Sequence, residues 1–344
     1  MQNVDYRIYP DYASKVIMRD ESYVAKRVWG NVVQGNMIDL TRRLSSDSSD
    51  IVHFQFNYGF FKLNDLAEAI EQLHEEKKIV ITFHKTEDAE IDGQVVSLHS
   101  ITKQLNLCAA LIVHQEADRK LLCSYGVKEE IIHIINHGQV VYPEIDAKLV
   151  QKQQNISASP VIGSYGFFLS HKGIKEVIQA IAILKEEFPH ILYTPVCAFY
   201  EGNVSTEYYN ECVAEAERLG VQKHVKFITD FLPNTESMAH LQACDVLVMP
   251  YKPTKESASG AIRFCMAVKR PIITTRQPIF DEFKESTYQI EAADKELIAD
   301  AIRSLVKDSS TADIYTAAID RYVRKNSWYA TADKIYGLYR SLIS

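Results

Sequence analysis

The stretch Val161-Ile-Gly-Ser-Tyr-Gly-Phe-Phe-Leu-Ser-His-Lys-Gly-Ile174 joins an apolar run to a turn of small residues and then to an apolar stripe at helical spacing. This pattern predicts a strand, a glycine turn around Gly166 and Gly173, and a helix that begins at about Ile174. Backbone N–H groups at a helix start attract anions, and Lys172 adds a full positive charge beside them. The turn is therefore a candidate phosphate site, although Lys172 as a solvated surface residue is the alternative.

Apolar runs of similar length recur along the chain and alternate with amphipathic segments. Such an alternation is typical of α/β proteins with parallel sheets, in which strands are buried on both faces. We therefore expect strands at 51–56, 79–83, 109–113, 131–135, 191–199, 225–228, 245–250 and 271–275.

The length of 344 residues favours two domains that share a ligand site. Residues 144–160 are polar and irregular, and we expect a linker there. An N-terminal lobe would then cover residues 1–143 and a C-terminal lobe residues 161–311, while residues 312–344 would form helices that pack on the lobes.

The net charge, the cysteines and the length of the apolar runs limit the kinds of ligand and the cellular location that we expect. A net charge of −7 argues against broad binding to nucleic acid, so a small ligand is expected. The six cysteines form no C-x-x-C pair, which disfavours a zinc or redox site and suits a reducing compartment. Because no apolar run reaches the ~20 residues of a membrane span, we expect a cytoplasmic protein whose membrane contact, if any, is peripheral.

A second small-residue loop follows the predicted strand at 245–250. It reads Glu256-Ser-Ala-Ser-Gly260 and precedes the apolar segment 261–267. Backbone N–H groups of Ser257, Ala258, Ser259 and Gly260 could hold a diphosphate, and the Glu256 carboxylate could accept sugar hydroxyls. Glu256 as a simple helix cap is the competing interpretation.

Together these elements resemble the C-terminal lobe of family 4 glycosyltransferases over residues 160–280. In that family a strand–turn–Lys-Gly helix is followed by an Asp-x-x-x-x-Pro strand end, here Asp245 to Pro250, and by a signature that begins at Glu256. The resemblance implies a GT-B fold of two Rossmann-like lobes with a central cleft. It also implies a nucleotide-sugar donor, UDP- or GDP-linked, with the base near Phe231, retention of anomeric configuration, and neither metal nor other cofactor.

Strand ends in the N-terminal half extend the resemblance. Asp50-Ile-Val-His-Phe-Gln-Phe-Asn-Tyr-Gly59 places Asn57, Tyr58 and Gly59 on the expected acceptor side. Ile79-Val-Ile-Thr-Phe-His84 places His84 where relatives approach the transferred sugar, although a histidine after an apolar strand is more often structural. The stretches 112–116 and 134–138 resemble the next two strand ends.

Three features depart from the family pattern. Phe167 stands where relatives often have a phosphate-binding arginine, so Lys172, helped by Arg263, is expected to carry that charge. Phe264 replaces a glutamate that usually contacts the donor ribose. The first strand and glycine-rich loop of the N-terminal lobe are missing, so we expect a reduced lobe, a fragment of a larger protein, or a partner chain that supplies the rest.

The sequence thus predicts a glycosyltransferase that moves a sugar to a glycan or lipid-linked acceptor. We expect it to act in surface polysaccharide biosynthesis. His84 and Glu256 would orient the sugar, while Lys172 and Arg263 would stabilise the departing diphosphate. Two alternatives remain open. A non-catalytic subunit would bind donor or partner without transfer, and a sugar-nucleotide epimerase of the same architecture would act on the donor alone.

Overall fold

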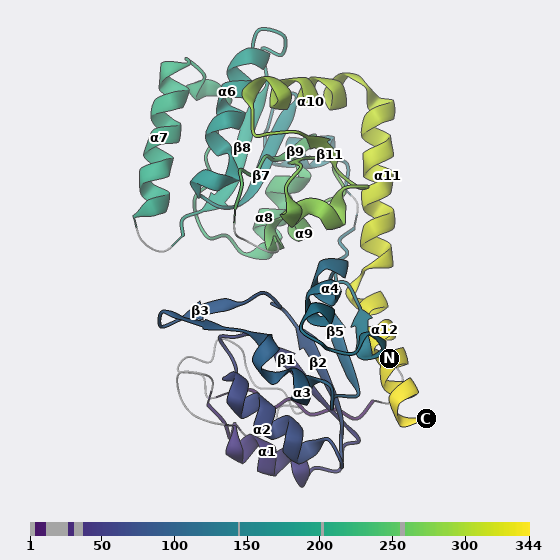
Figure 1. The fold of residues 1–344 in the computed structure, drawn as a ribbon. Coiled ribbons are helices and arrows are strands. Elements are labelled where there is room, and N and C mark those ends of the chain that lie inside the picture. Colours follow the sequence, from purple (N-terminus) through teal and green to yellow (C-terminus); the bar gives the residue numbers. More distant parts are fainter. Residues whose placement is uncertain (1–3, 12–26, 31–36, 144, 201–202, 255–258) are drawn as a thin grey trace. The chain divides into compact units, whose positions relative to one another are not determined.

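The computed structural model describes residues 4–11, 27–30, 37–143, 145–200, 203–254 and 259–344. The chain divides into two compact units. Unit 1 comprises residues 1–137 and 331–344, and unit 2 comprises residues 138–330. Both are α/β units with parallel sheets, which confirms the predicted fold class (Figure 1). None of the helices in the described ranges is both long and apolar enough to cross a membrane.

Within the described residues, unit 1 has a four-stranded parallel sheet of order β1-β2-β5-β6. Buried branched and aromatic side chains dominate these strands, as expected where helices cover both faces. The strands are β1 (Ile51–Phe56), β2 (Lys78–Phe83), β5 (Ala110–Val113) and β6 (Ile132–Ile134).

Different helices pack on the two faces of this sheet. On one face, side chains such as Leu66 and Ile70 of α2 pack in a core with Phe54 and Ile81. On the other, Leu338 of α12 packs with its helix neighbours against the sheet. The remaining elements are α1 (Ile38–Ser45), α2 (Leu63–Leu73), the hairpin β3 (Ala89–Ile91) and β4 (Gln94–Val96), η1 (Leu98–Ile101), α3 (Thr102–Leu105), α4 (Glu116–Ser124), η2 (Glu129–Ile131) and α12 (Trp328–Ile343).

In the part of unit 2 that the structure describes, the sheet has five parallel strands of order β11-β10-β9-β7-β8. From β7 the chain steps to β8 on one side, and it then returns to β9 on the other. The strand order therefore reverses between β7 and β9, and open α/β sheets bind ligands outside the carboxyl ends at such a point. The strands are β7 (Val161–Phe167), β8 (Leu192–Ala198), β9 (Val246–Met249), β10 (Ile272–Thr275) and β11 (Tyr288–Ile290).

Helices cover both faces of the unit 2 sheet. The stripe predicted from Ile174 to Leu184 is buried along α6 and joins a core with α7 and α10. Side chains of α8, α9 and α11 fill the opposite core. The helices are α5 (Ala147–Gln153), η3 (Ser170–Lys172), α6 (Ile174–Leu184), α7 (Val204–Arg218), η4 (Gln222–His224), α8 (Asn234–Gln242), α9 (Gly260–Met266), η5 (Pro278–Phe283), α10 (Lys295–Lys307) and α11 (Ser309–Lys325).

Two local expectations differ from the structure. The segment 225–228 is no strand: it makes isolated bridges from Val225 to Tyr193 and from Ile228 to Val196. The division between units falls at Gly138, before the expected linker at 144–160. That stretch contains α5, where buried Gln151 donates to the Ala243 carbonyl at 2.8 Å. Because the segment is rich in Lys and Gln, its sequence showed no sign of this contact with a distant part of the chain.

Candidate functional site

A cavity of about 430 Å³ opens in unit 2 at the carboxyl ends of β7 and β8, beside the start of α9. Its position agrees with the reversal of strand order next to β7. The described residues that line it are mostly aromatic, small or polar, as in ligand pockets generally. They are Tyr165, Gly166, Phe167, Lys172, Val196, Ala198, Asp230, Phe231, Leu232, Asn234, Ser237, Ser259, Gly260, Ala261 and Phe264.

Lys172 is held at the cavity by the turn between β7 and α6. Gly173 follows it with φ of 73°, and a Cβ there would collide with the carbonyl oxygen of Pro250. Only glycine fits such a position without strain. The Lys172 Nζ atom lies 4.0 Å from the centroid of the Tyr251 ring, a cation–π contact. Because Tyr251 is fully buried after β9, the ring fixes where the ammonium group sits.

Aromatic side chains form two stacked pairs in the lining. Phe264 stacks on Tyr165 with centroids 4.6 Å apart and an interplanar angle of 19°. Phe167 and Phe231 lie 6.4 Å apart at 20°. Phe231 is 82% exposed, so a planar ring could still stack on it. The two phenylalanines that depart from the family pattern therefore give the cavity apolar walls.

The second small-residue loop is described only in part. Glu256, Ser257 and Ala258 lie outside the described residues. Ser259 caps α9 by accepting a hydrogen bond from the Ile262 N–H at 3.3 Å, and its hydroxyl lies 3.3 Å from the buried Tyr251 hydroxyl. Gly260 lines the cavity, and a Cβ added there would meet nothing within 4 Å.

Arg263 has a different place from the one expected. Its guanidinium group pairs with the Glu282 carboxylate, and Tyr322 donates a hydrogen bond to the same carboxylate. The Arg263 side chain is only 13% exposed, and it does not appear among the cavity-lining residues. In this structure Arg263 therefore holds α9 against its neighbours, and its help in holding phosphate stays a prediction.

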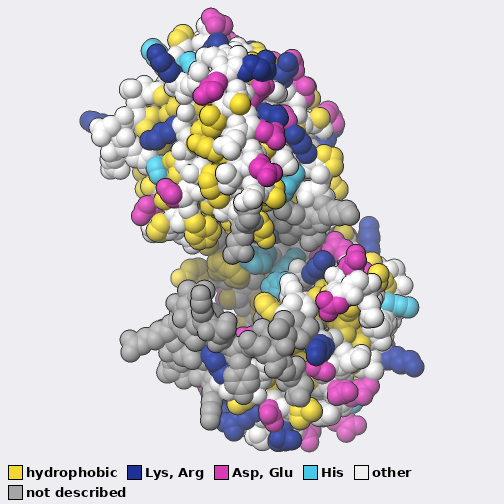
Figure 2. Space-filling model, turned by 90° about the vertical axis from the view of Figure 1, so that its left-hand side faces the viewer, with side chains coloured by type: hydrophobic (Ala, Val, Ile, Leu, Met, Phe, Trp, Pro, Cys, Tyr) yellow, Lys and Arg dark blue, Asp and Glu magenta, His cyan; other side chains and the backbone are white. Residues whose placement is uncertain are grey.

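His84 lies in unit 1 just after β2, beside two further histidines. Figure 2 shows several histidine side chains gathered at one place on the face that it draws. Its ring centroid is 5.3 Å from that of His114, which follows β5, and 6.3 Å from that of His137, which follows β6. Burial, together with repulsion from His114 and His137, lowers the pKa of His84 to about 4. No three His, Cys, Asp or Glu side chains of the described ranges are arranged to hold a metal ion.

The three residues expected on the acceptor side differ in their exposure to solvent. Asn57 accepts a hydrogen bond from the Gly59 N–H at 2.9 Å, and this contact shapes the turn after β1. Tyr58 is buried against Phe56 at 5.1 Å, and burial raises the pKa of its hydroxyl. Asn57 and Gly59 thus remain candidates, whereas Tyr58 is a core residue in this structure.

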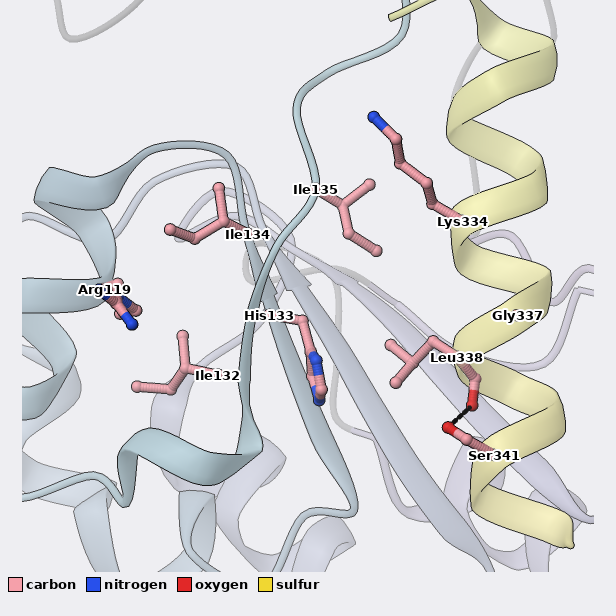
Figure 3. A pocket seen from close by; sticks show the side chains of 9 residues that line it. All are labelled: Arg119, Ile132, His133, Ile134, Ile135, Lys334, Gly337, Leu338 and Ser341. Atoms are coloured by element: carbon pink, nitrogen blue, oxygen red, sulfur yellow. Dashed lines mark hydrogen bonds between the residues drawn. The ribbon is translucent and has the colours of Figure 1, made fainter. Parts of the chain in front are cut away.

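A larger hollow of about 590 Å³ lies in unit 1 along β6, away from every predicted site residue. Figure 3 shows Arg119 on one side of the strand and α12 with Lys334 and Leu338 on the other. Arg119 already pairs with Glu116 and Glu129. Size alone does not make this hollow the site, because none of the predicted site residues lines it and it does not lie at a reversal of strand order.

The fold brings several residues to these places that no sequence pattern singled out. Tyr251 directly follows the strand-end motif Asp245 to Pro250, and its ring positions Lys172. His114 and His137 were quoted as parts of strand ends without being singled out. A polar side chain directly after a predicted parallel strand was the available signal.

Comparison with solved structures agrees with this architecture. The chain is similar to Anabaena HepE in complex with UDP, with a TM-score of 0.67 and 15% identity over 88% of this chain and 82% of that one. It is also similar to a Rickettsia africae glycosyltransferase, with a TM-score of 0.67 and 16% identity over 89% and 80% of the two chains. Two Rossmann-like units with a cavity at the strand reversal of the second define the GT-B class of fold.

The family follows from the sequence match. The chain belongs to the family "Glycosyl transferases group 1", which matches residues 146–324. It is 29% identical over 191 residues to a D-inositol 3-phosphate glycosyltransferase of Corynebacterium urealyticum, covering 54% of this chain and 44% of the relative. A D-inositol 3-phosphate glycosyltransferase of Corynebacterium glutamicum is 25% identical over 241 residues, covering 67% and 56%. The chain thus spans about half the length of the curated relatives it matches.

Proposed function

We propose that the chain is a glycosyltransferase that binds a nucleoside diphosphate sugar in the unit 2 cavity and transfers the sugar to a glycan or lipid-linked acceptor. The observation that carries this proposal is the cavity itself. It combines a positioned cation at a helix start with aromatic walls at the strand reversal. A nucleotide sugar offers the matching groups, namely a diphosphate, a planar base and hydroxyls.

The residues have distinct roles in this proposal. Lys172 and the backbone at the start of α6 compensate the charge that develops on the departing diphosphate. Phe231 offers its exposed ring to the base, and Gly260 leaves room beside it. His84 serves the sugar or acceptor from unit 1. Because these groups can stabilise the leaving group, we propose a reaction that needs no metal. We propose retention of anomeric configuration from the resemblance to family 4 glycosyltransferases.

The cellular setting belongs to the same proposal. A UDP- or GDP-sugar is the donor we infer, and solved structures of the neighbour HepE contain UDP, UDP with glucose, or UDP-glucose. Surface polysaccharide synthesis at the inner face of a membrane, by peripheral association, is the setting that the acceptor class suggests. The D-inositol 3-phosphate named for the relatives makes phosphorylated cyclitols a further acceptor to test.

The decisive assay incubates the chain with labelled UDP- and GDP-sugars, with and without a panel of glycan and lipid-linked acceptors. Release of nucleoside diphosphate that depends on acceptor, together with a labelled product, is expected. Turnover of donor in the absence of any acceptor would favour the epimerase alternative. Donor binding with no turnover under any condition would favour a non-catalytic subunit.

Filling the cavity should abolish nucleotide binding without unfolding the protein. Gly260→Leu adds a side chain to a residue that lines the cavity, at a position where a Cβ would meet nothing within 4 Å, and leucine favours the helix more than glycine does. We expect at least a tenfold loss of nucleoside diphosphate affinity by calorimetry, with no loss of thermal stability.

The matched control is Gly337→Leu on α12. Gly337 also has open space at its Cβ and lines the hollow along β6. Nucleotide affinity should be unchanged in this variant. Equal affinities in both variants and the wild type would remove the unit 2 cavity from donor binding.

A further inference from the structure

A continuous chain of side chains crosses the carboxyl edge of the unit 1 sheet. The His84 Nε2 atom lies 2.9 Å from the Gln55 amide oxygen, and its Nδ1 atom lies 3.4 Å from His114 Nε2. His114 Nδ1 in turn lies 2.9 Å from the Ile135 carbonyl oxygen. At the other end, the Gln55 amide nitrogen lies 3.2 Å from His53 Nε2.

Counting protons along this chain shows that it is one proton short when both histidines are neutral. The Ile135 carbonyl and the Gln55 amide oxygen can only accept hydrogen bonds. Three contacts join these two acceptors through His84 and His114, so three N–H groups are needed. Two neutral imidazoles carry only two. With the amide oxygen of Gln55 toward His84, all three hydrogen bonds form only when the histidine pair holds one additional proton.

If the amide oxygen and nitrogen of Gln55 exchange places, the additional proton is no longer needed. Its NH₂ group then donates to His84 Nε2, His84 Nδ1–H donates to His114, and His114 Nδ1–H donates to the Ile135 carbonyl. The Gln55 oxygen and the Thr82 hydroxyl oxygen, which lies 2.7 Å from His53 Nε2, now share the His53 Nε2–H, and His53 Nδ1 accepts from the Tyr339 hydroxyl that contacts it. Every contact is satisfied with all histidines neutral.

We propose that His84 and His114 bind one proton jointly and that the side-chain amide of Gln55 turns over when they do, which makes His114 a positioning residue for His84. The importance of His84 for catalysis rests on the proposed function. The proton count does not, because it follows from hydrogen bonds within unit 1 alone.

The surroundings favour the neutral state near pH 7. Burial first, and then the neighbouring His114 and His137, lower the pKa of His84, and burial lowers that of His53 to about 4. The groups that face the pair are His53 on β1, His137 after β6 and, through His53, Tyr339 on α12. On α4, the nearby carboxylate of Asp118 bonds instead to Thr86 and to the backbone of its own helix start.

The test is a pH titration of the whole chain without ligand, followed by NMR of the imidazole nitrogens and of the Gln55 side-chain amide between pH 4 and 8. We expect the imidazole signals of His84 and His114 to change together at one midpoint. The Gln55 amide signal should change at that same midpoint. Separate midpoints for the two histidines, or a Gln55 signal that stays constant throughout, would overturn the proposal.

Two variants sharpen the result. Gln55→Glu supplies a fixed charged acceptor to His84, so the shared midpoint should rise by at least about one pH unit, a tenfold gain in proton affinity. His114→Phe should abolish the shared transition and leave His84 to titrate alone at a different midpoint. An unchanged midpoint in Gln55→Glu would contradict the proposal even if the His114 variant fails to fold.

The control is His74→Asn. His74 is partly exposed, and its ring lies 2.9 Å from the Glu71 carbonyl oxygen in α2. Its replacement should leave the shared midpoint where it is. Since none of these readouts involves donor or acceptor, failure of the proposed transferase activity would leave their outcome intact.

Discussion

Arg263→Ala is expected to lower the free energy of unfolding of unit 2 by about 3–5 kcal/mol, the usual cost of removing one partner of a buried ion pair. The side chains of Arg263 and Glu282 are only 13% and 7% exposed. Without the guanidinium group, the buried Glu282 carboxylate would lose its ion-pair partner and would keep the hydrogen bond from the Tyr322 hydroxyl. Urea unfolding followed by far-UV circular dichroism would measure the loss.

Arg276→Ala provides a matched comparison for that variant. Arg276 also pairs with a glutamate, Glu291, but the two side chains are 59% and 68% exposed. Exposed pairs contribute about 0–1 kcal/mol, so this replacement should change stability little. If Arg263→Ala kept wild-type stability and instead weakened nucleotide binding tenfold, the arginine would belong to the phosphate site after all.

Lys172→Ala should weaken the binding of nucleoside diphosphates by about 10- to 100-fold. Hydrogen bonds to charged groups contribute about 1.5–3 kcal/mol, and each ~1.4 kcal/mol is a factor of ten in affinity. The fold should survive, because the cation–π contact with Tyr251 is worth only about 0.5–2 kcal/mol. Calorimetric titration with UDP and GDP measures the effect.

A nearby lysine serves as the control for Lys172. Lys252 follows Tyr251 but pairs with Glu176 at 2.6 Å, and it is not among the residues that line the cavity. Lys252→Ala should therefore leave nucleotide affinity unchanged. Equal losses in the two variants would indicate a general electrostatic effect rather than a phosphate contact by Lys172.

The fold was largely predictable because its signals are local. The apolar run at 161–167, the glycines of the turn and the helical stripe after Ile174 lie within one short stretch, and each favours the same strand–turn–helix unit. The segment 225–228 has the composition of a strand as well. It forms only isolated bridges, because the extent of a ladder depends on neighbours that composition does not reveal.

The candidate site was predictable only for residues whose position is set by the neighbouring residues of the same loop. Lys172 and Gly260 fall at the cavity for that reason. Arg263 does not, because its partners Glu282 and Tyr322 are distant in the sequence and reach it only through packing. The histidine pair was missed for the same cause: His84 and His114 follow separate strands, and their contact exists only once β2 and β5 lie side by side.

The central claim is that the unit 2 cavity binds a nucleoside diphosphate sugar, and ligand-dependent thermal stabilisation tests it most directly. A panel of UDP- and GDP-sugars would be added to the wild type and to Gly260→Leu. A ligand at ~100 times its dissociation constant adds ~2.7 kcal/mol of stability. We predict that at least one member stabilises the wild type by about this amount and has no effect on Gly260→Leu. Failure of every member to stabilise the wild type, or equal stabilisation of both proteins, would contradict the claim.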